Sequence, residues 1–413
     1  MRVLSSLLSA TALIIMGNIP LLRAANVKVP EQIHLAFGPT PDTISVQWAT
    51  LDVFCTGATT VQFGLSKTAL TQTATGSCFK FNLGSGILQQ SHHVAYMQPL
   101  AASTKYYYKV GDGTTWSSIY FFKTAPDAVT ISTVLPQKFL VYGDMGSSAS
   151  PPAGSTTVLP WVTAEVHRSR IDMILHIGDF AYDMDSNNGQ NGRLFMNDIQ
   201  NASAYIPYMV DPGNHEVGYN FAFYTEFFRG MPSNPTPPYT TVTTDNGVAP
   251  NNWYFSWNLG LVHFVTISSE IYFDYPNLVA SQWNWLKADL QTAAANRTAA
   301  PWIIVNGHRS IYCSCDGDCD SDATALRAGV KQSDGSYRYG VESLLYQYGV
   351  DLWINGHEHN YERMYDVEPH EIYTYLSGVT TKTTTNPPGP IYIVTGDAGN
   401  YENHESNSLF FFF

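Results

Sequence analysis

The chain has 413 residues and a formal net charge of −13; 44% of its residues are hydrophobic and only 13% are charged. These proportions are typical of a globular protein with a sizeable core and about two or three domains, and they exclude a long disordered chain. The acidic balance argues against a nucleic-acid-binding protein, which would need a basic surface. An acidic protein that handles an anionic substrate needs a local source of positive charge, and metal ions are one such source.

The first 25 residues predict a secretory signal peptide. Arg2 supplies a basic start, an apolar run extends from Leu7 to Met16, and Ala24 and Ala25 are small residues of the kind that precede a cleavage site. The apolar run is too short to span a bilayer. We therefore expect no transmembrane segment and a protein that is secreted or delivered to a vacuolar or lysosomal compartment.

The N-glycosylation sequons and the cysteines are consistent with passage through the secretory pathway. Asn201 and Asn296 each begin an N-glycosylation triplet. Cys55 and Cys78 are expected to form a disulfide in an oxidising compartment. Three further cysteines crowd one loop, and two of them are expected to pair, with a zinc site as the alternative. These three are Cys313, Cys315 and Cys319.

Residues 28–125 predict an all-β domain. The stretch TISVQWAT (43–50) alternates apolar and polar residues, and TKYYYKVGDG (104–113) does so before a glycine-containing turn. Short alternating strands separated by turns are typical of a sandwich of the fibronectin III or immunoglobulin type. The sequence shows no cluster of ligand-type residues here, so we expect a structural or docking module whose histidines serve packing.

From Gln137 to residue 413 the pattern changes to apolar strands that alternate with helical segments, among them 281–295 and 341–349. This alternation predicts an α/β domain with a mostly parallel sheet. Four apolar runs end in glycine followed by aspartate or histidine: KFLVYGD (138–144), DMILHIGD (172–179), PWIIVNGH (301–308) and VDLWINGH (350–357). Because ligands bind outside the carboxyl ends of such strands, we expect these polar tips to meet at one edge.

Five short stretches carry ligand-type side chains at predicted strand ends. They are GDMG (143–146), GDFAY (178–182), GNHE (213–216), VNGH (305–308) and GHEH (356–359). Any one of them alone is most often a tight turn with a solvated side chain, whereas five in succession indicate a shared site. A further stretch of the same kind, GDAG (396–399), is interpreted as a plain turn.

In this order the five stretches resemble the signature blocks of the metallophosphoesterases, and specifically of the purple acid phosphatases. The resemblance covers about residues 28–404, and GHRSIYC (307–313) is similar to the animal, fungal and oomycete branch. It implies a catalytic β-sandwich flanked by helices, preceded by the all-β domain. It also implies a secreted acid phosphatase that hydrolyses phosphate monoesters.

The resemblance implies two metal ions that share the carboxylate of Asp179. One ion would be bound by Asp144, Asp179, Tyr182 and His359, and the other by Asp179, Asn214, His308 and His357. Carboxylate, phenolate, amide and imidazole donors suit a two-metal site that acts on phosphate esters.

Tyr182 predicts which metal is present. Most relatives in the wider superfamily have a histidine two residues after the first aspartate, but here that position is Gly146. Tyr182 would replace it as a phenolate, which is a hard anionic ligand. A free phenol ionises only near pH 10, so a strong Lewis acid is needed to hold the phenolate at low pH. We therefore expect Fe(III) together with a divalent ion, either Zn, Fe or Mn.

The resulting mechanistic hypothesis is in-line attack of a metal-held hydroxide on the phosphorus of a small phosphate ester. His215 is the first candidate to protonate the leaving group. Glu216 is a second catalytic candidate, which could act by orienting His215. The acidic loop 310–320 stands where plant members carry a histidine pair. An acidic rim disfavours highly phosphorylated substrates, so a phytase is not expected.

Two other functions remain open on the sequence. One is a phosphodiesterase or nucleotidase on the same fold, and the other is a secreted binding protein with a purely structural metal site. Family members usually continue beyond the region of residue 400 with further strands, whereas this sequence ends in SLFFFF (408–413). We therefore expect either a truncated sequence or a protein that lacks an element of the catalytic sheet. The sequence does not address the oligomeric state.

Overall fold

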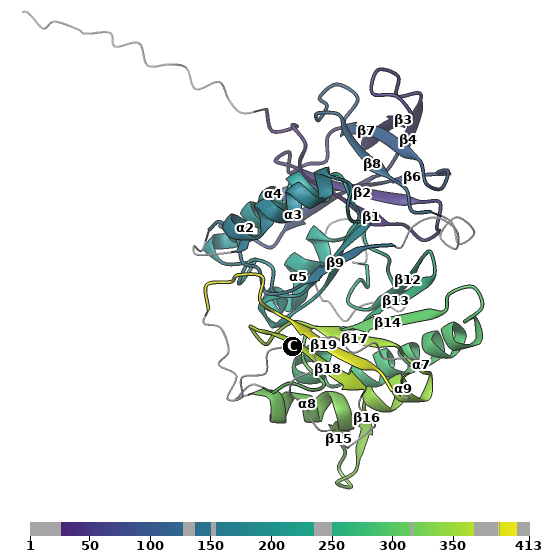
Figure 1. Cartoon of the computed structure of the whole chain (residues 1–413). Helices are drawn as coiled ribbons and strands as arrows, with labels where there is room; N and C mark the ends of the chain where they lie inside the picture. The colour runs from purple at the N-terminus through teal and green to yellow at the C-terminus, as the bar shows by residue number, and fades with distance from the viewer. Residues whose placement is uncertain are drawn as a thin grey trace, which may run out of the picture.

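The structure is a computed structural model of the chain. It describes residues 26–126, 137–149, 154–234, 250–314, 318–366, 387 and 389–402, without the side chains of 318–321 and 365–366. Over these residues an all-β domain precedes an α/β domain, as predicted, and the two domains pack against each other (Figure 1). The predicted signal peptide and the tail 403–413 lie outside the described residues. Among the helices that are described, none has the length and apolar character needed to cross a bilayer.

The N-terminal domain is a sandwich of two antiparallel four-stranded sheets. In hydrogen-bonded order, one contains β1 (Glu31–Phe37), β2 (Ile44–Thr50), β6 (Gln89–Met97) and β5 (Ser77–Asn82). The other contains β4 (Gln72–Thr75), β3 (Thr60–Gly64), β7 (Lys105–Gly111) and β8 (Tyr120–Lys123). Large side chains such as Trp48, Phe63 and Tyr108 are fully buried in the core. The predicted sandwich is therefore confirmed.

One face of this sandwich is covered by the α/β domain. Every residue of β2 is buried, including polar ones, so the alternating pattern of 43–50 does not mark a solvent face. The side-chain amide of Gln47 donates to the carbonyl oxygens of Glu226 (2.8 Å) and Phe227 (2.9 Å) and accepts from the backbone N–H of Gly230 (2.7 Å). Hydrogen bonds thus replace water for the side chain of Gln47.

Among the described residues, the α/β domain has two main sheets and one two-stranded hairpin. A parallel sheet has the order β11 (Tyr208–Asp211), β10 (Met173–Ile177) and β9 (Phe139–Tyr142). A six-stranded sheet has the order β12 (Phe255–Leu259), β13 (Val262–Thr266), β14 (Trp302–Asn306), β17 (Leu352–Asn355), β19 (Ile391–Thr395) and β18 (Tyr361–Asp366). In this second sheet β13, β14, β17 and β19 run parallel, and β12 and β18 are antiparallel neighbours at its edges.

This arrangement differs in one respect from the expectation of a single sheet edge. The runs 138–144 and 172–179 belong to the three-stranded sheet, whereas 301–308 and 350–357 belong to the six-stranded one. The two sheets meet where the backbone N–H of Gly143 donates to the carbonyl oxygen of Thr395 (2.9 Å). The polar tips consequently converge from two sheets.

Helices flank both sheets (Figure 1). The α-helices are α2 (Gly154–Thr157), α3 (Leu159–His167), α4 (Gln190–Ser203), α5 (Gly218–Phe227), α6 (Ile271–Asp274), α7 (Val279–Ala295), α8 (Asp318–Ala328) and α9 (Glu342–Gln347). Two short 3-10 helices, η1 (Asn187–Gly189) and η2 (Asn214–Glu216), and a hairpin of β15 (Gly329–Lys331) and β16 (Tyr337–Tyr339) complete the elements. Helices α7 and α9 correspond to the predicted segments 281–295 and 341–349.

A disulfide joins Cys55 and Cys78, the pair expected from the sequence (S–S 2.01 Å). Cys313 is also disulfide-bonded, while Cys315 and the side chain of Cys319 lie outside the described residues. A disulfide sulfur cannot serve as a thiolate ligand, so Cys313 cannot be a ligand of the alternative zinc site.

The two sequons lie in different settings. Asn201 is exposed in the last turn of α4, but Ser203 of its triplet is buried and its hydroxyl donates to the carbonyl oxygen of Ile33 (3.1 Å). Asn296 is exposed and directly follows α7. The second sequon is therefore the more accessible acceptor for a glycan.

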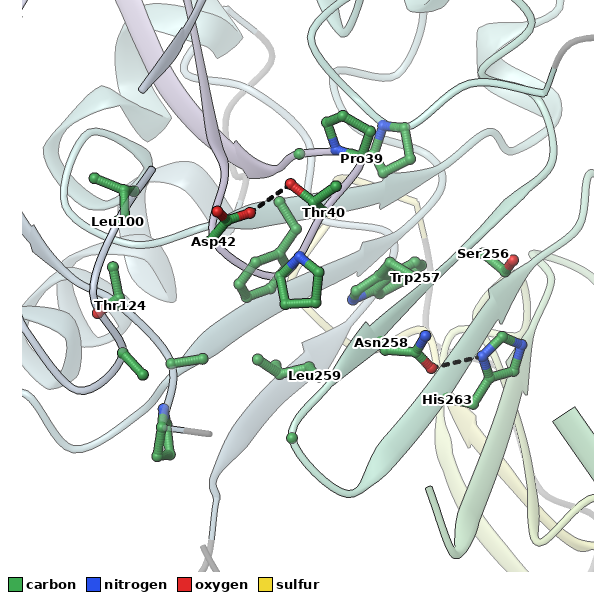
Figure 2. Close-up of a pocket in the computed structure, with 18 residues that line it drawn as sticks. Pro39, Thr40, Asp42, Leu100, Thr124, Ser256, Trp257, Asn258, Leu259 and His263 are labelled. Atoms are coloured by element: carbon green, nitrogen blue, oxygen red, sulfur yellow. Dashed lines mark hydrogen bonds between the residues drawn. The ribbon is translucent and has the colours of Figure 1, made fainter. Parts of the chain in front are cut away.

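A cavity of about 290 Å³ lies between the two domains, beside the β12–β13 hairpin (Figure 2). Thr40 and Asp42 line it from the sandwich, and Trp257 and His263 line it from the hairpin. None of the predicted metal ligands is among its lining residues. This cavity is therefore separate from the predicted metal site.

Candidate metal centre

Asp144 and Asp179 follow β9 and β10 after a single glycine each, and both are buried. Each has a left-handed backbone conformation, with φ of 64° and 54°, which turns its side chain away from the strand path. Gly178 before Asp179 also has a positive φ (74°), and a Cβ there would lie 2.4 Å from Nδ1 of His308. Only glycine fits this close approach without displacing the histidine.

Tyr182 and His359 gather around Asp144. The hydroxyl of Tyr182 lies 3.0 Å from Nε2 of His359, and both atoms are 3.5 Å from Oδ1 of Asp144. Burial, together with the carboxylates of Asp144 and Asp179, raises the pKa of Tyr182. The phenol would therefore stay protonated without a cation, and a bound metal ion is what would make it a phenolate ligand.

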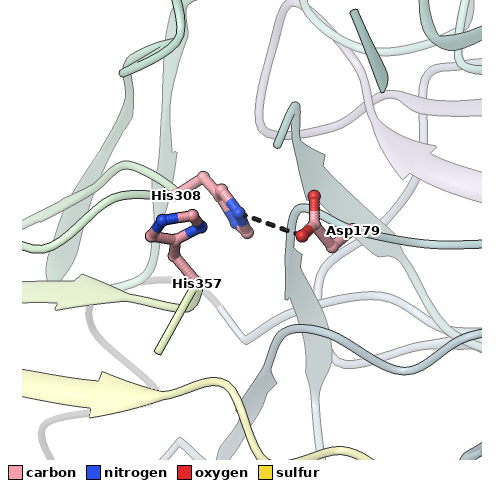
Figure 3. Close-up of side chains that lie close together, drawn as sticks. All are labelled: Asp179, His308 and His357. Carbon is pink, nitrogen blue, oxygen red and sulfur yellow. Dashed lines mark ion pairs between the residues drawn. The ribbon is translucent and has the colours of Figure 1, made fainter. Parts of the chain in front are cut away.

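Asp179, His308 and His357 form the second part of the site, with ligand atoms all within 4.8 Å of one another (Figure 3). Nε2 of His308 lies 3.3 Å from Oδ2 of Asp179 and 3.0 Å from Oδ1 of Asn214. Its Nδ1 donates to the carbonyl oxygen of Ile177 (3.0 Å). Because that carbonyl can only accept, the lone pair of the neutral ring lies on Nε2, which faces the cluster.

The donor set fits metal ions. Two buried carboxylates, a phenol, an amide oxygen and three imidazoles converge here, and these hard and borderline donors suit first-row metals. A positive ion would also relieve the repulsion between the carboxylates of Asp144 and Asp179. The structure thus brings together all seven residues expected to be ligands, while their division between two ions stays a prediction.

His215 lies beside this cluster on η2. Its Nδ1 is 2.9 Å from Oδ1 of Asp183, its ring packs on that of Tyr182 (centroids 4.4 Å apart), and its Nε2 lies 3.9 Å from Oδ2 of Asp179. Burial acts to lower the pKa of His215, but the hydrogen bond with Asp183 and the charge of Asp179 outweigh it and raise the pKa to about 9. With this pKa the ring carries a proton at neutral and acidic pH.

Glu216 contacts backbone amides. Its carboxylate accepts hydrogen bonds from the N–H groups of Asp179 (2.8 Å), Phe180 (3.0 Å) and Gly213 (2.9 Å). Burial and the charge of Asp179 raise the pKa of Glu216 to about 7, against the effect of these bonds. Glu216 thus links the backbone at Asp179 and Phe180 to that at Gly213, while its catalytic role stays a prediction.

The segment that contains GDAG (396–399) is more than a plain turn, so that interpretation is wrong. The backbone N–H and the side-chain amide of Asn400 both donate to the carbonyl oxygen of Asp144 (3.1 and 3.2 Å). A Cβ on Gly396 would lie 2.3 Å from the carbonyl oxygen of Glu358 and 2.9 Å from Oδ2 of Asp144. The segment therefore packs directly against the site.

Sequence reasoning missed three acidic residues near the cluster. Asp183 pairs with His215, and Glu402 approaches Nε2 of both His215 (3.8 Å) and His359 (3.9 Å). Asp322, on α8, lies 3.7 Å from Nε2 of His357. Of the three, only Asp183 could have been found from the sequence, because it directly follows the predicted ligand Tyr182. The other two come from segments whose approach depends on the tertiary fold.

Family models match both domains. The model of the calcineurin-like phosphoesterases covers residues 137–361, and that of the purple acid phosphatase N-terminal domain covers residues 30–124. The first match defines the class as a metallophosphoesterase, in agreement with the convergent donors at the strand ends.

Curated relatives narrow the class further. Acid phosphatase type 7 of Danio rerio is 35% identical over 387 residues, which cover 91% of this chain and 80% of the relative. Acid phosphatase type 7 of Homo sapiens is 35% identical over 376 residues (90% and 78%). Purple acid phosphatase 15 of Arabidopsis thaliana is 29% identical over 422 residues (90% and 69%).

A solved structure agrees in fold. The purple acid phosphatase PPD1 from yellow lupin seeds superposes with a TM-score of 0.68 at 22% identity, over 92% of this chain and 66% of that chain. The chain belongs to the purple acid phosphatase family of metallophosphoesterases and is an acid phosphatase by that membership. The family implies a dinuclear metal centre, and the clustered donors are consistent with one.

Proposed function

We propose that this protein is a secreted acid phosphatase that hydrolyses small phosphate monoesters at a dinuclear centre of Fe(III) and a divalent ion. The observation that carries the proposal is that the hydroxyl of Tyr182 approaches the buried carboxylate of Asp144 and the ring of His359, which supports a phenolate ligand in a chain that has Gly146 instead of the superfamily's histidine. Asp144, Asp179, Tyr182 and His359 would hold the ferric ion. Asp179, Asn214, His308 and His357 would hold the divalent ion, either Zn, Fe or Mn.

When bound, the two cations would supply Lewis-acid activation of the phosphate and of the attacking water. The protein's own part is to orient and to move protons. Asp179 would be shared by the two ions, and Glu216 holds the backbone around it through bonds to the N–H groups of Asp179, Phe180 and Gly213. His215 would donate a proton to the leaving oxygen, because its Nε2 faces the cluster while its Nδ1 is held by Asp183.

The surroundings of the site favour small substrates of low charge. Asp183 and Glu402 are half-exposed at its rim, where each adds a negative charge. A substrate with several phosphate groups would be repelled by these carboxylates. This supports the proposal of simple monoesters over inositol polyphosphates.

Secretion is supported by the N-terminal sequence and by the disulfide. Residues 1–25 have the pattern of a signal peptide, and the Cys55–Cys78 bond would persist in an oxidising compartment. Glycosylation at Asn296 would add to this support, since that residue is exposed. Sequencing the mature N-terminus of the secreted protein would test the cleavage.

The visible absorption spectrum and the metal content of the purified protein test the proposed centre. We expect one iron and one divalent ion per chain, and a purple or pink band that disappears in Tyr182→Phe while iron is retained. A colourless wild-type protein with two bound metals would refute phenolate ligation. Turnover of p-nitrophenyl phosphate should exceed that of bis-(p-nitrophenyl) phosphate, and the reverse order would favour a phosphodiesterase.

A further inference from the structure

The cavity of about 290 Å³ between the two domains contains a buried hydrogen-bond donor without a partner. Trp257, on β12, lines the cavity, and only 5% of this residue is exposed. Its Nε1–H can only donate, and it makes no hydrogen bond with any described residue. Figure 2 shows this nitrogen on the edge of the indole ring that faces the sandwich side of the cavity. Because a buried donor without an acceptor is costly, this edge suits a ligand that accepts a hydrogen bond.

The sandwich side of the cavity offers a hydrogen-bond acceptor. Asp42 lies in the turn between β1 and β2, where it is exposed. Its Oδ1 accepts a hydrogen bond from the hydroxyl of Thr40 (2.6 Å), while its Oδ2 makes none within the described part of the chain (Figure 2). The acceptor belongs to the N-terminal domain and the donor to the α/β domain, so a bound molecule would contact both domains.

His263 also lines the cavity, but both of its ring nitrogens already have neighbours. Nε2 lies 2.8 Å from Oδ2 of Asp289, and Nδ1 lies 2.9 Å from Oδ1 of Asn258. Any charge on the ring is thereby compensated by Asp289. Among the described residues no lysine or arginine lines the cavity. A phosphate or another anion bound there would therefore face the carboxylate of Asp42 without a cation to offset the repulsion.

Much of the remaining lining is apolar. It includes Leu100, Leu259 and four prolines, which are Pro39, Pro41, Pro126 and Pro232. Ligand pockets of proteins usually have volumes of about 300–1,000 Å³, so a cavity at the lower end of this range fits a ligand with one ring. A cation would leave the N–H of Trp257 without an acceptor, and an anion is disfavoured by Asp42. The ligand that satisfies these conditions is small and neutral, and its polar groups both donate and accept hydrogen bonds.

We propose that this cavity is a binding site for a neutral sugar ring, formed jointly by the two domains. A sugar hydroxyl can both donate to Asp42 and accept from Trp257, whereas the C–H groups of the ring would pack on the prolines and leucines. Because such a ligand binds the folded pair of domains, it would stabilise the protein against unfolding. None of the predicted metal ligands lines the cavity, so the proposal does not rest on the proposed chemistry at the metal centre.

The test uses the full-length, metal-containing protein and three neutral sugars: glucose, galactose and mannose. Each sugar is titrated by isothermal titration calorimetry, and the sugar with the highest affinity is then compared with its uronate. The uronate keeps the ring and adds one negative charge, so this pair of ligands measures the effect of Asp42. A second titration in saturating inorganic phosphate shows whether the sugar binds at the metal centre instead.

Two variants and one control locate the sugar in the cavity. Trp257→Phe keeps an aromatic ring and removes the N–H, and Asp42→Asn removes the charge at an exposed position. Trp161→Phe is the control, because Trp161 is 54% exposed on α3 and does not line the cavity. Thermal unfolding of each variant is recorded with and without sugar. Without sugar, Trp257→Phe should be at least as stable as the wild type, because it removes a buried donor that has no acceptor.

We expect at least one neutral sugar to bind in the millimolar range, to raise the thermal midpoint, and to bind more tightly than its uronate. Trp257→Phe should weaken binding by about 3- to 10-fold, the effect of one hydrogen bond. Asp42→Asn should narrow the difference between the sugar and its uronate, and Trp161→Phe should match the wild type.

Three results would each overturn the proposal and leave the proposed acid phosphatase intact. The first is that none of the three neutral sugars binds. The second is that the uronate binds more tightly than the neutral sugar, or that phosphate displaces the sugar. The third is wild-type affinity in both Trp257→Phe and Asp42→Asn, which would place the sugar outside this cavity.

Discussion

Nδ1 of His215 and Oδ1 of Asp183 are 2.9 Å apart, and this pair connects the rim of the site to its proposed proton donor. Asp183 is half-exposed, whereas the His215 side chain is 19% exposed and packs on Tyr182. The carboxylate therefore fixes the ring from the solvent side, with Nε2 directed to the cluster. This arrangement explains how a residue outside the ligand set can affect the reaction.

Asp183→Asn is expected to impair substrates with poor leaving groups selectively. An amide orients the ring less firmly and stabilises the imidazolium less than a carboxylate does. Positioned general acids contribute about 10²- to 10⁴-fold, so we expect kcat for an alkyl phosphate to fall by about 10-fold or more. With p-nitrophenyl phosphate, whose leaving group needs no proton, kcat should change little. KM should stay similar for both substrates.

The matched control is Asp185→Asn, two residues further along the same loop. Among the described residues Asp185 forms no ion pair with His215, so this variant should retain the wild-type ratio of alkyl to aryl turnover. Equal losses for both substrates in Asp183→Asn would contradict the assigned role.

Gly396→Ala is expected to disrupt the metal site from the C-terminal segment. The added Cβ would meet the carbonyl oxygen of Glu358 at 2.3 Å, and a backbone atom cannot move aside cheaply. The segment must shift away from Asp144, so we expect a loss of bound metal and of most activity. Metal content per chain, compared with Gly335→Ala, measures the effect. Gly335 has open space around its Cβ and lies in the turn between β15 and β16, so the strain of an alanine at its positive φ stays local and that variant should keep its metal.

The residues at strand ends were predictable because their geometry is local. A buried apolar run followed by glycine and a ligand residue predicts where Asp144, Asp179, His308 and His357 lie, whatever the order of the strands. The distribution of these strands over two sheets was not predictable, because periodicity reveals strands but not their partners. The polar residues at the strand ends nevertheless converge, because the two sheets meet at Gly143 and Thr395.

Residues that act across segments escaped prediction for a physical reason. Asp322 lies near His357, which is 35 positions away along the chain, and Glu402 lies near His215, which is 187 positions away. Patterns within a short stretch of sequence cannot predict such contacts. The polar face of β2 was likewise hidden, because its pattern looks like that of a strand with one solvent face. Only the packing of the second domain shows that Gln47 is buried.

Glu216→Gln is expected to destabilise the fold and weaken the metal site. The carboxylate accepts three backbone N–H bonds with two oxygens, whereas an amide offers one accepting oxygen and one donor. At least one buried N–H would lose its partner, which costs about 1–3 kcal/mol. Urea unfolding should show this loss. Glu165→Gln, which loses ion pairs with the exposed Arg168 and Arg170 at the surface, should change the urea midpoint far less.

The buried His92 at the domain interface is expected to make the protein less stable in acid. Its Nδ1 donates to the carbonyl oxygen of Glu226 (2.6 Å) and its Nε2 accepts from the side-chain amide of Gln90 (2.7 Å), so neither nitrogen can take a further proton without breaking a bond. Burial lowers the pKa of His92 from 6.5 to about 3, although the bond to Glu226 opposes this change. The neutral ring is therefore required for the native interface.

The direction of the pH effect follows from this pKa. The unfolded chain binds the proton below about pH 6.5 and the folded chain does not, so stability is full above that pH and falls as the pH decreases toward 3. For His92 alone the loss between pH 7 and pH 5 is about 2 kcal/mol. In His92→Gln, which does not titrate, the difference between urea midpoints at these two pH values should shrink accordingly. His167→Gln, at the surface, should keep the wild-type difference, and an unchanged difference in His92→Gln would contradict the prediction.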